Sequence, residues 1–215
     1  MLKKKLVSLL ALALSSMMLL SACVGNADGD TQGGNGGEGT QTNASGEVVK
    51  DANELVIGTY MPVTTLVPWK TTSDGDGYIL RQIYHTLVEM DEQSNFVPSL
   101  ATEWQCSEDG LTWTVKIRDD VYWQTGNGLF DEKVKVTAED VKFSYDYYLD
   151  PANGSVRYTE LSKSLKEVNV IDPTTVEFVT NDIDVLWEYK MYQNYIIPQK
   201  AIEENWDFEN QPVGS

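Results

Sequence analysis

Hydrophobic and polar residues alternate strictly along residues 111–118. Leu111, Trp113, Val115 and Ile117 fall on one side of an extended chain, and polar residues fill the positions between them. Because successive side chains of a strand point to opposite faces, this period of two predicts a β-strand with one buried face. A strand pairs its backbone groups with its neighbours, so an adjacent segment should be extended as well.

The segment 101–106 is predicted to be that partner. Residues 108–110, Glu-Asp-Gly, are turn formers, so the two strands should make a β-hairpin. A second pair of strands is predicted at 167–171 and 175–179, because Asp172-Pro173-Thr174 between them is a good turn sequence.

Capping signals predict a helix that begins after Thr137. Asp140 stands where a capping box usually has Glu or Gln, and Asp150-Pro151 ends the helix. One face of this helix carries Val141, Ser144, Tyr145, Tyr148 and Leu149. Hydrophobic spacing and Pro198 predict further helices at 78–90, within 153–166, at 184–191 and at 199–204.

An apolar run at 55–59 predicts a buried strand, and a long loop should follow it over 60–77. The end of this loop, Asp74-Gly75-Asp76-Gly77, lacks the ligand spacing and the terminal Glu of an EF-hand. A plain loop before the helix at 78–90 is therefore the preferred interpretation.

Four sequence blocks in fixed order carry a resemblance to a known family. They are Pro98–Trp104, Asp109–Trp113, Ile117–Val121 and Thr137–Val141. This region resembles the family 5 solute-binding proteins, which are the dipeptide-, oligopeptide- and nickel-binding components of ABC importers. The resemblance implies an α/β, periplasmic-binding-protein-like type II fold, with a mixed α+β small lobe. One departure is the segment 124–136, which is longer than usual and is interpreted as an insertion.

The resemblance also implies a division of the chain. The last residues, Pro212-Val213-Gly214, match the start of the motif with which this family returns to its first lobe. The chain is therefore interpreted as an N-terminal portion, with an incomplete fold and the rest of the two-lobed receptor beyond Ser215. The expected parts are a lipoprotein signal peptide (1–22), a flexible tether (23–53), the first strand and cleft loop of lobe one (54–77), the small insert domain (78–209) and the start of the return to lobe one (210–215).

The N-terminus has the pattern of an export signal. Lys3, Lys4 and Lys5 precede an apolar run at 6–20, which is too short to favour a membrane-spanning helix. Leu20-Ser21-Ala22-Cys23 resembles the lipobox of bacterial lipoproteins, which implies a diacylglyceryl group on Cys23 and a location on the outer face of the cell membrane. The alternative is an ordinary signal peptide with a chance cysteine.

Composition argues against several classes of function. The chain carries 16 Lys+Arg against 33 Asp+Glu, a net charge of −17, so no nucleic-acid binding is expected. The one histidine, His85, is interpreted as solvated or capping, and Cys106 as a small hydrophobic residue that is often buried. One His and one Cys beyond the signal cannot form a Cys-His site or a His-rich metal site. No enzyme activity, cofactor or metal is therefore predicted.

The family resemblance implies which residues would contact a solute. Met61, Thr64 and Thr65 lie in the loop after the first predicted strand, Tyr158 follows Asp150-Pro151, and Asn194 precedes Pro198. Ordinary loop or edge packing is at least as probable for each of them. The tyrosines and tryptophans could stack on ligands, although core packing explains most of them.

The functional expectation is a lipid-anchored receptor, and two alternatives stay open. The receptor would capture a peptide or another small solute by hinge closure of two lobes and deliver it to ABC permease subunits; a monomer is expected. One alternative is a sensor or adhesion lipoprotein on the same scaffold. The other is a truncated, inactive fragment.

Overall fold

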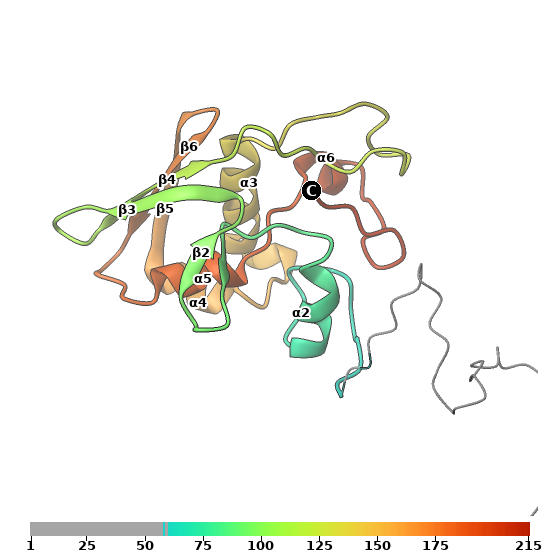
Figure 1. Ribbon diagram of the computed structural model, residues 1–215, viewed down its shortest axis with the longest axis horizontal. Helices are drawn as coiled ribbons and strands as arrows, with labels where there is room; N and C mark the ends of the chain where they lie inside the picture. Colours follow the sequence, from blue (N-terminus) through green and yellow to red (C-terminus); the bar gives the residue numbers. More distant parts are fainter. Residues whose placement is uncertain (1–57, 59) are drawn as a thin grey trace, which may run out of the picture. The chain divides into compact units, whose positions relative to one another are not determined.

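A computed structural model describes residue 58 and residues 60–215 (Figure 1). The predicted signal peptide, the tether and the predicted strand at 55–59, apart from Gly58, lie outside these residues. Within the described part, no helix is both long enough and apolar enough to cross a membrane.

The main sheet has four antiparallel strands in the order β3-β4-β6-β5. They are β3 (Ala101–Cys106), β4 (Thr112–Ile117), β6 (Thr175–Thr180) and β5 (Leu165–Asp172). Both predicted strand pairs are thus confirmed, and the strand that alternates most strictly lies inside the sheet between β3 and β6. Gly110 has a φ of +76°, a conformation that glycine adopts without steric cost, and it closes the first hairpin.

The alternation along β4 sets which face of the sheet is buried. Val115 and Ile117 are buried, whereas Lys116 points to the other face and pairs with Glu103 across the hairpin at 2.5 Å. Trp113, nearer the start of the strand, is only half-buried.

Helix α3 (Ala138–Leu149) packs on the sheet, as Figure 1 shows. The predicted capping box is present: the Thr137 amide donates to Asp140 Oδ2 at 2.9 Å. The Tyr145 ring meets the Phe178 ring of β6 edge-on, with centroids 4.8 Å apart. Asp150 ends the helix, and a 3-10 turn, η1 (Pro151–Asn153), follows.

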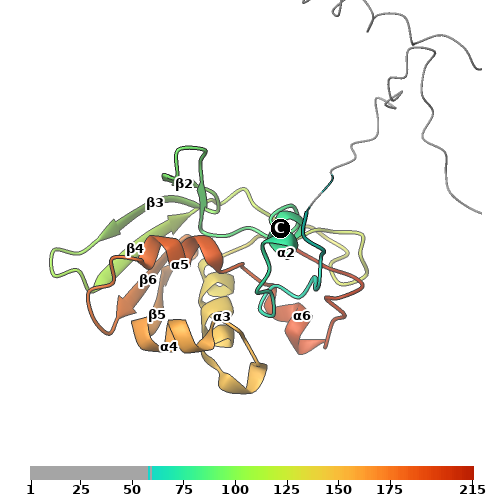
Figure 2. The same cartoon turned by 90° about the horizontal axis from the view of Figure 1, so that it is seen from below.

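Smaller elements complete the described fold (Figure 2). Helices lie where three were predicted: α4 (Tyr158–Ser164), α5 (Trp187–Gln193) and α6 (Gln199–Glu203). Pro198 stands at the cap position, one residue before the first helical residue. A separate two-stranded sheet pairs β1 (Val88–Met90) with β2 (Phe96–Pro98).

The predicted helix at 78–90 is wrong. Helix α2 (Asp74–Leu80) begins earlier, inside the predicted loop, because Ser73 Oγ accepts from the Gly75 amide at 3.1 Å and caps it. The chain then turns and becomes extended, with the Thr86 carbonyl accepting from the Leu100 amide at 3.1 Å. The hydrophobic residues at helical spacing are still buried, but they lie in a turn and a strand and not in a helix, because long-range pairing outweighs the local pattern.

Candidate functional site

A buried carboxylate joins the loop before α2 to the helix itself. The Thr64 amide donates to Asp76 Oδ1 at 2.5 Å, and the Thr65 amide donates to the same oxygen at 3.2 Å. The Thr71 hydroxyl donates to Oδ2 at 2.8 Å and the Thr64 hydroxyl donates to it at 2.9 Å. Burial alone would raise the pKa of Asp76, but these hydrogen bonds outweigh it and hold the pKa below its usual value.

The same loop is fixed from a second side. The Thr65 hydroxyl donates to Glu209 Oε2 at 2.7 Å, and the Leu66 amide donates to Glu209 Oε1 at 3.4 Å. Gly75 allows the close approach: a Cβ there would lie 2.7 Å from the carbonyl oxygen of Pro62. The loop therefore reaches α2 at a distance that only glycine permits.

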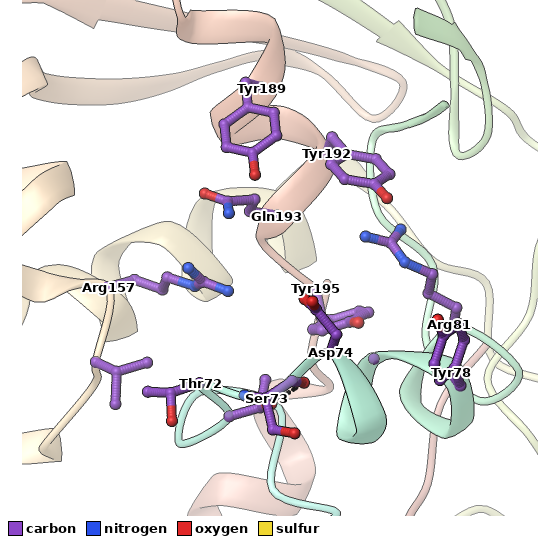
Figure 3. A pocket seen from close by; sticks show the side chains of 13 residues that line it. Thr72, Ser73, Asp74, Tyr78, Arg81, Arg157, Tyr189, Tyr192, Gln193 and Tyr195 are labelled. Atoms are coloured by element: carbon purple, nitrogen blue, oxygen red, sulfur yellow. Dashed lines mark hydrogen bonds between the residues drawn. The ribbon is translucent and has the colours of Figure 1, made fainter. Parts of the chain in front are cut away.

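A cleft of about 530 Å³ opens beside this anchored loop (Figure 3). Three parts of the chain surround it: α2 with the residues directly before and after it, the segment that precedes α4, and α5 with the residues after it. The lining residues are Thr71, Thr72, Ser73, Asp74, Gly77, Tyr78, Arg81, Val156, Arg157, Tyr189, Tyr192, Gln193 and Tyr195.

Aromatic rings form much of this lining. Tyr189 and Tyr192 stand three residues apart on α5, so they share one helical face, and their ring centroids are 5.9 Å apart. Tyr78 of α2 is about half exposed on the cleft. Tyr195 is buried, and burial raises its pKa, so it stays a neutral hydrogen-bonding group at ordinary pH.

The two arginines that line the cleft differ in their interactions. Arg81 Nη1 lies 2.8 Å from Glu89 Oε2, and its guanidinium lies 3.8 Å from the Tyr192 ring centroid. The guanidinium of Arg157 has no hydrogen bond or ion pair to any described residue, and its Nε is buried. Figure 3 shows the two side chains on opposite sides of the cleft. The site can hold an acidic group on one side and apolar or aromatic groups in the middle.

The sequence matches a known family over more than half of the chain. Residues 95–215 match the profile described as bacterial extracellular solute-binding proteins, family 5 middle. The chain belongs to this family. Within the described residues, no group of three or more His, Cys, Asp or Glu side chains could hold a metal ion.

Curated relatives in family 5 are much longer than this chain. The glutathione-binding protein GsiB of Escherichia coli O1:K1 / APEC is 32% identical over 126 residues, which cover 59% of this chain and 23% of that protein. The oligopeptide-binding protein AliB of Streptococcus pneumoniae serotype 4 is 28% identical over 137 residues, covering 57% and 21%. The chain thus spans between a fifth and a quarter of the length of these relatives.

Solved structures confirm the predicted fold class. The periplasmic binding protein DppA of Helicobacter pylori, in complex with the peptide STSA, superposes with a TM-score of 0.64 at 25% identity. That match covers 70% of this chain and 33% of DppA. MoaA of A.tumefacien R10, in complex with mannopinic acid, gives 0.60 at 32% identity, covering 71% and 31%. The fold is therefore α/β and periplasmic-binding-protein-like, and the match covers about a third of each of these longer proteins.

The five residues that the family resemblance marked for solute contact do not line the cleft, although residues next to Tyr158 and Asn194 in the sequence do. Thr64 and Thr65 bind Asp76 and Glu209 as described, and Met61 lies half-buried beside Gly75. Tyr158 is half-buried at the first position of α4, directly after Arg157. Asn194 is buried between two lining residues, and its Nδ2 donates to the Lys190 carbonyl at 2.7 Å. Solute contact by these five residues stays a prediction.

Sequence reasoning missed the cleft residues that carry most of its chemistry. Arg81, Arg157, Tyr189 and Tyr192 lie up to 111 positions apart, and nothing local links them. The spacing of Tyr189 and Tyr192 was a usable signal only in part, because the helix predicted at 184–191 ends one residue before Tyr192, whereas α5 includes both.

The residues interpreted as functionally silent are half-buried. His85 Nδ1 lies 3.0 Å from Ser215 Oγ, and burial is the main reason that the pKa of His85 is lowered. Cys106 is partly exposed at the end of β3, where burial and Asp109 raise the pKa of its thiol. A raised thiol pKa disfavours the reactive thiolate.

Proposed function

We propose that this protein is the substrate-binding component of an ABC importer for peptides or chemically related small solutes. A lipid on Cys23 holds it at the outer face of the cell membrane. Two lobes close around the solute by hinge motion, and the closed form delivers it to the permease. The observation that carries the proposal is an open, tyrosine-rich cleft with two arginines in a chain that belongs to family 5.

The names of three relatives support a peptide, whereas the MoaA structure holds mannopinic acid. GsiB binds glutathione, AliB is an oligopeptide-binding protein, and the DppA structure holds a tetrapeptide. NikZ of Campylobacter jejuni, with Ni(L-His), shows that the same fold also serves other ligands; it is 26% identical with a TM-score of 0.60, over 72% of this chain and 30% of NikZ.

The cleft supplies two kinds of interaction that suit a peptide. Tyr189 and Tyr192 offer ring faces that exclude water from apolar side chains, and the polar groups of Thr72 and Ser73 lie on the opposite side. The contacts of Asp76 fix the loop next to α2, so that the cleft keeps its shape before a solute arrives. A preformed site loses less conformational entropy on binding.

An uptake assay in a strain that lacks the gene tests this proposal. The wild-type gene should restore uptake of labelled peptides, whereas a Tyr189→Ala, Tyr192→Ala double variant should reduce it at least about tenfold, because each aromatic contact is worth about 1 kcal/mol. Tyr122→Ala is the matched control: this tyrosine is exposed and lies outside the cleft. Immunoblots must show equal amounts of each variant.

Two outcomes would contradict the proposal. Full uptake with the double variant would mean that the cleft has no part in transport. Peptide binding by the protein, without any loss of uptake in the deletion strain, would favour a sensor.

The lipid anchor is tested in the same strain background: Cys23→Ala should move the protein from the membrane fraction to the soluble fraction. Retention of that variant in the membrane would disprove lipid attachment at Cys23.

A further inference from the structure

Arg157 is the one arginine without an acidic partner among the residues that the structure describes. The sequence has three arginines, and all of them are described. Arg81 pairs with Glu89, and Arg118 pairs with Asp120 at 2.8 Å. Arg157 has no such partner among the described residues, although the chain has 33 acidic residues against 16 basic ones.

The isolation of Arg157 is unfavourable as it stands. Its Nε is buried without an acceptor, and a buried donor without a partner destabilises the folded state. Buried polar groups in folded proteins are almost always hydrogen-bonded, so each exception needs an explanation. A cavity directly in front of the guanidinium provides one, because an incoming acceptor could complete the hydrogen bonding.

The surroundings of Arg157 select the kind of acceptor. Figure 3 shows its guanidinium pointing into the cleft toward the side that carries Gln193 and Tyr189. A guanidinium presents a flat fork of N–H donors that matches the two oxygens of a carboxylate. The aromatic rings of α5 suit an apolar group attached next to that carboxylate.

We propose that Arg157 binds a carboxylate of the solute, so that the cleft takes organic acids and peptides with a free carboxyl group. This inference rests on the proposed function of the cleft. Arg81 does not share the task, because Glu89 and the Tyr192 ring already occupy its guanidinium. Arg157 therefore determines specificity, and Arg81 holds the wall of the cleft.

The test compares an acid with its neutral isostere. The probes are N-acetyl-phenylalanine and N-acetyl-phenylalanine amide, titrated into the ¹⁵N-labelled 215-residue chain at pH 7 and followed by NMR. We expect the acid to bind at least about tenfold more tightly than the amide, because a hydrogen bond to a charged group contributes about 1.5–3 kcal/mol. The shifted amide signals should include Gly77 and Gln193, which line the cleft.

Three variants make the test specific. Arg157→Gln should bring the acid-to-amide preference close to one, and Arg157→Lys should restore it in part, because lysine keeps the charge but not the fork. Arg118→Gln removes the same charge at an exposed position outside the cleft and should keep the full preference.

Each other outcome overturns the proposal. If both probes shift the cleft signals and bind the wild type with equal affinity, Arg157 does not bind a carboxylate, yet the cleft still binds a solute. If Arg118→Gln lowers the preference as much as Arg157→Gln, general electrostatics explain it. If neither probe shifts the cleft signals up to its solubility limit, the acid-binding site is refuted, whereas the uptake assay still decides the proposed function independently.

Discussion

The carboxylate of Asp76 is expected to be a major source of stability in the described fold. It is fully buried and accepts hydrogen bonds from two backbone amides and two hydroxyl groups of the preceding loop. An Asp76→Ala substitution would leave the amides of Thr64 and Thr65 without an acceptor. The hydroxyl groups could rotate toward other partners, but the amides are fixed by the backbone.

The size of the effect follows from counting these donors. A buried donor without a partner costs about 1–3 kcal/mol, and the lower half of that range applies to these two part-buried amides. Together with the lost packing this gives about 3–5 kcal/mol for Asp76→Ala. Asp76→Asn should cost only about 1–2 kcal/mol, because its Oδ1 can still accept from both amides. The new Nδ2 would donate to the Thr64 and Thr71 hydroxyls, which can act as acceptors.

Urea unfolding at pH 7 measures both values. With a denaturant dependence of about 2 kcal/mol per molar, the Asp76→Ala midpoint should fall by about 1.5–2.5 M. Asp74→Ala is the matched control on the same helix: Asp74 is exposed in the first turn, so its loss should cost no more than about 1 kcal/mol.

The pH dependence has a definite sign. Because the pKa of Asp76 is lowered in the folded protein, its charged form adds stability above the unfolded pKa of about 3.9. That contribution is lost as the pH falls through the folded pKa. The difference between the wild type and Asp76→Asn should therefore shrink below about pH 4. A cost of Asp76→Ala under about 1 kcal/mol, or a difference that grows on acidification, would refute the reasoning.

Two further substitutions should also destabilise the fold, and unfolding by urea can measure both. Gly214→Ala would place a Cβ 1.9 Å from the Ile83 carbonyl oxygen and should cost about 1–3 kcal/mol or more, whereas Gly77→Ala has room and should be neutral or slightly stabilising; equal effects would contradict this. Lys190→Met would leave Asp184, 2.8 Å from the buried ammonium, without its charged partner and should cost about 3–5 kcal/mol. A cost similar to that of Lys142→Met, whose side chain is only partly buried beside Asp146, would contradict it.

The sheet and α3 could be predicted because their determinants are local. Alternation along 111–118 specifies the buried face of β4, and Gly110 supplies the positive φ of the hairpin turn. Thr137 and Asp140 lie three residues apart and cap α3 through contacts within that span. Such patterns need no knowledge of the rest of the chain.

The segment after Gly77 shows where local patterns fail. Residues such as Leu80, Tyr84 and Leu87 are buried as a helix pattern requires, yet only Leu80 lies in a helix. Thr86 bridges to Tyr195, and β1 pairs with β2, so partners outside the segment decide its conformation. Spacing at three and four residues cannot separate a buried helix from a buried turn followed by a strand.

The candidate site was beyond local prediction for the same reason. The family resemblance led to Tyr158 and Asn194, one position away from the lining residues Arg157, Gln193 and Tyr195. These two predictions lie beside the cleft, but which side chain enters it depends on the exact start of α4 and the end of α5. Those boundaries are the least predictable features of a sequence.

The two arginines together explain how the cleft can be both rigid and receptive. Arg81 joins three elements, because it is the C-cap residue of α2, Glu89 belongs to β1 and Tyr192 belongs to α5. This ion pair and cation–π contact hold the tyrosine wall in place before any solute binds. Arg157, on the opposite side, keeps its hydrogen bonds unmade and therefore gains the most from a ligand. A cleft in which both arginines were paired would be more stable but would have no strong reason to bind an acid.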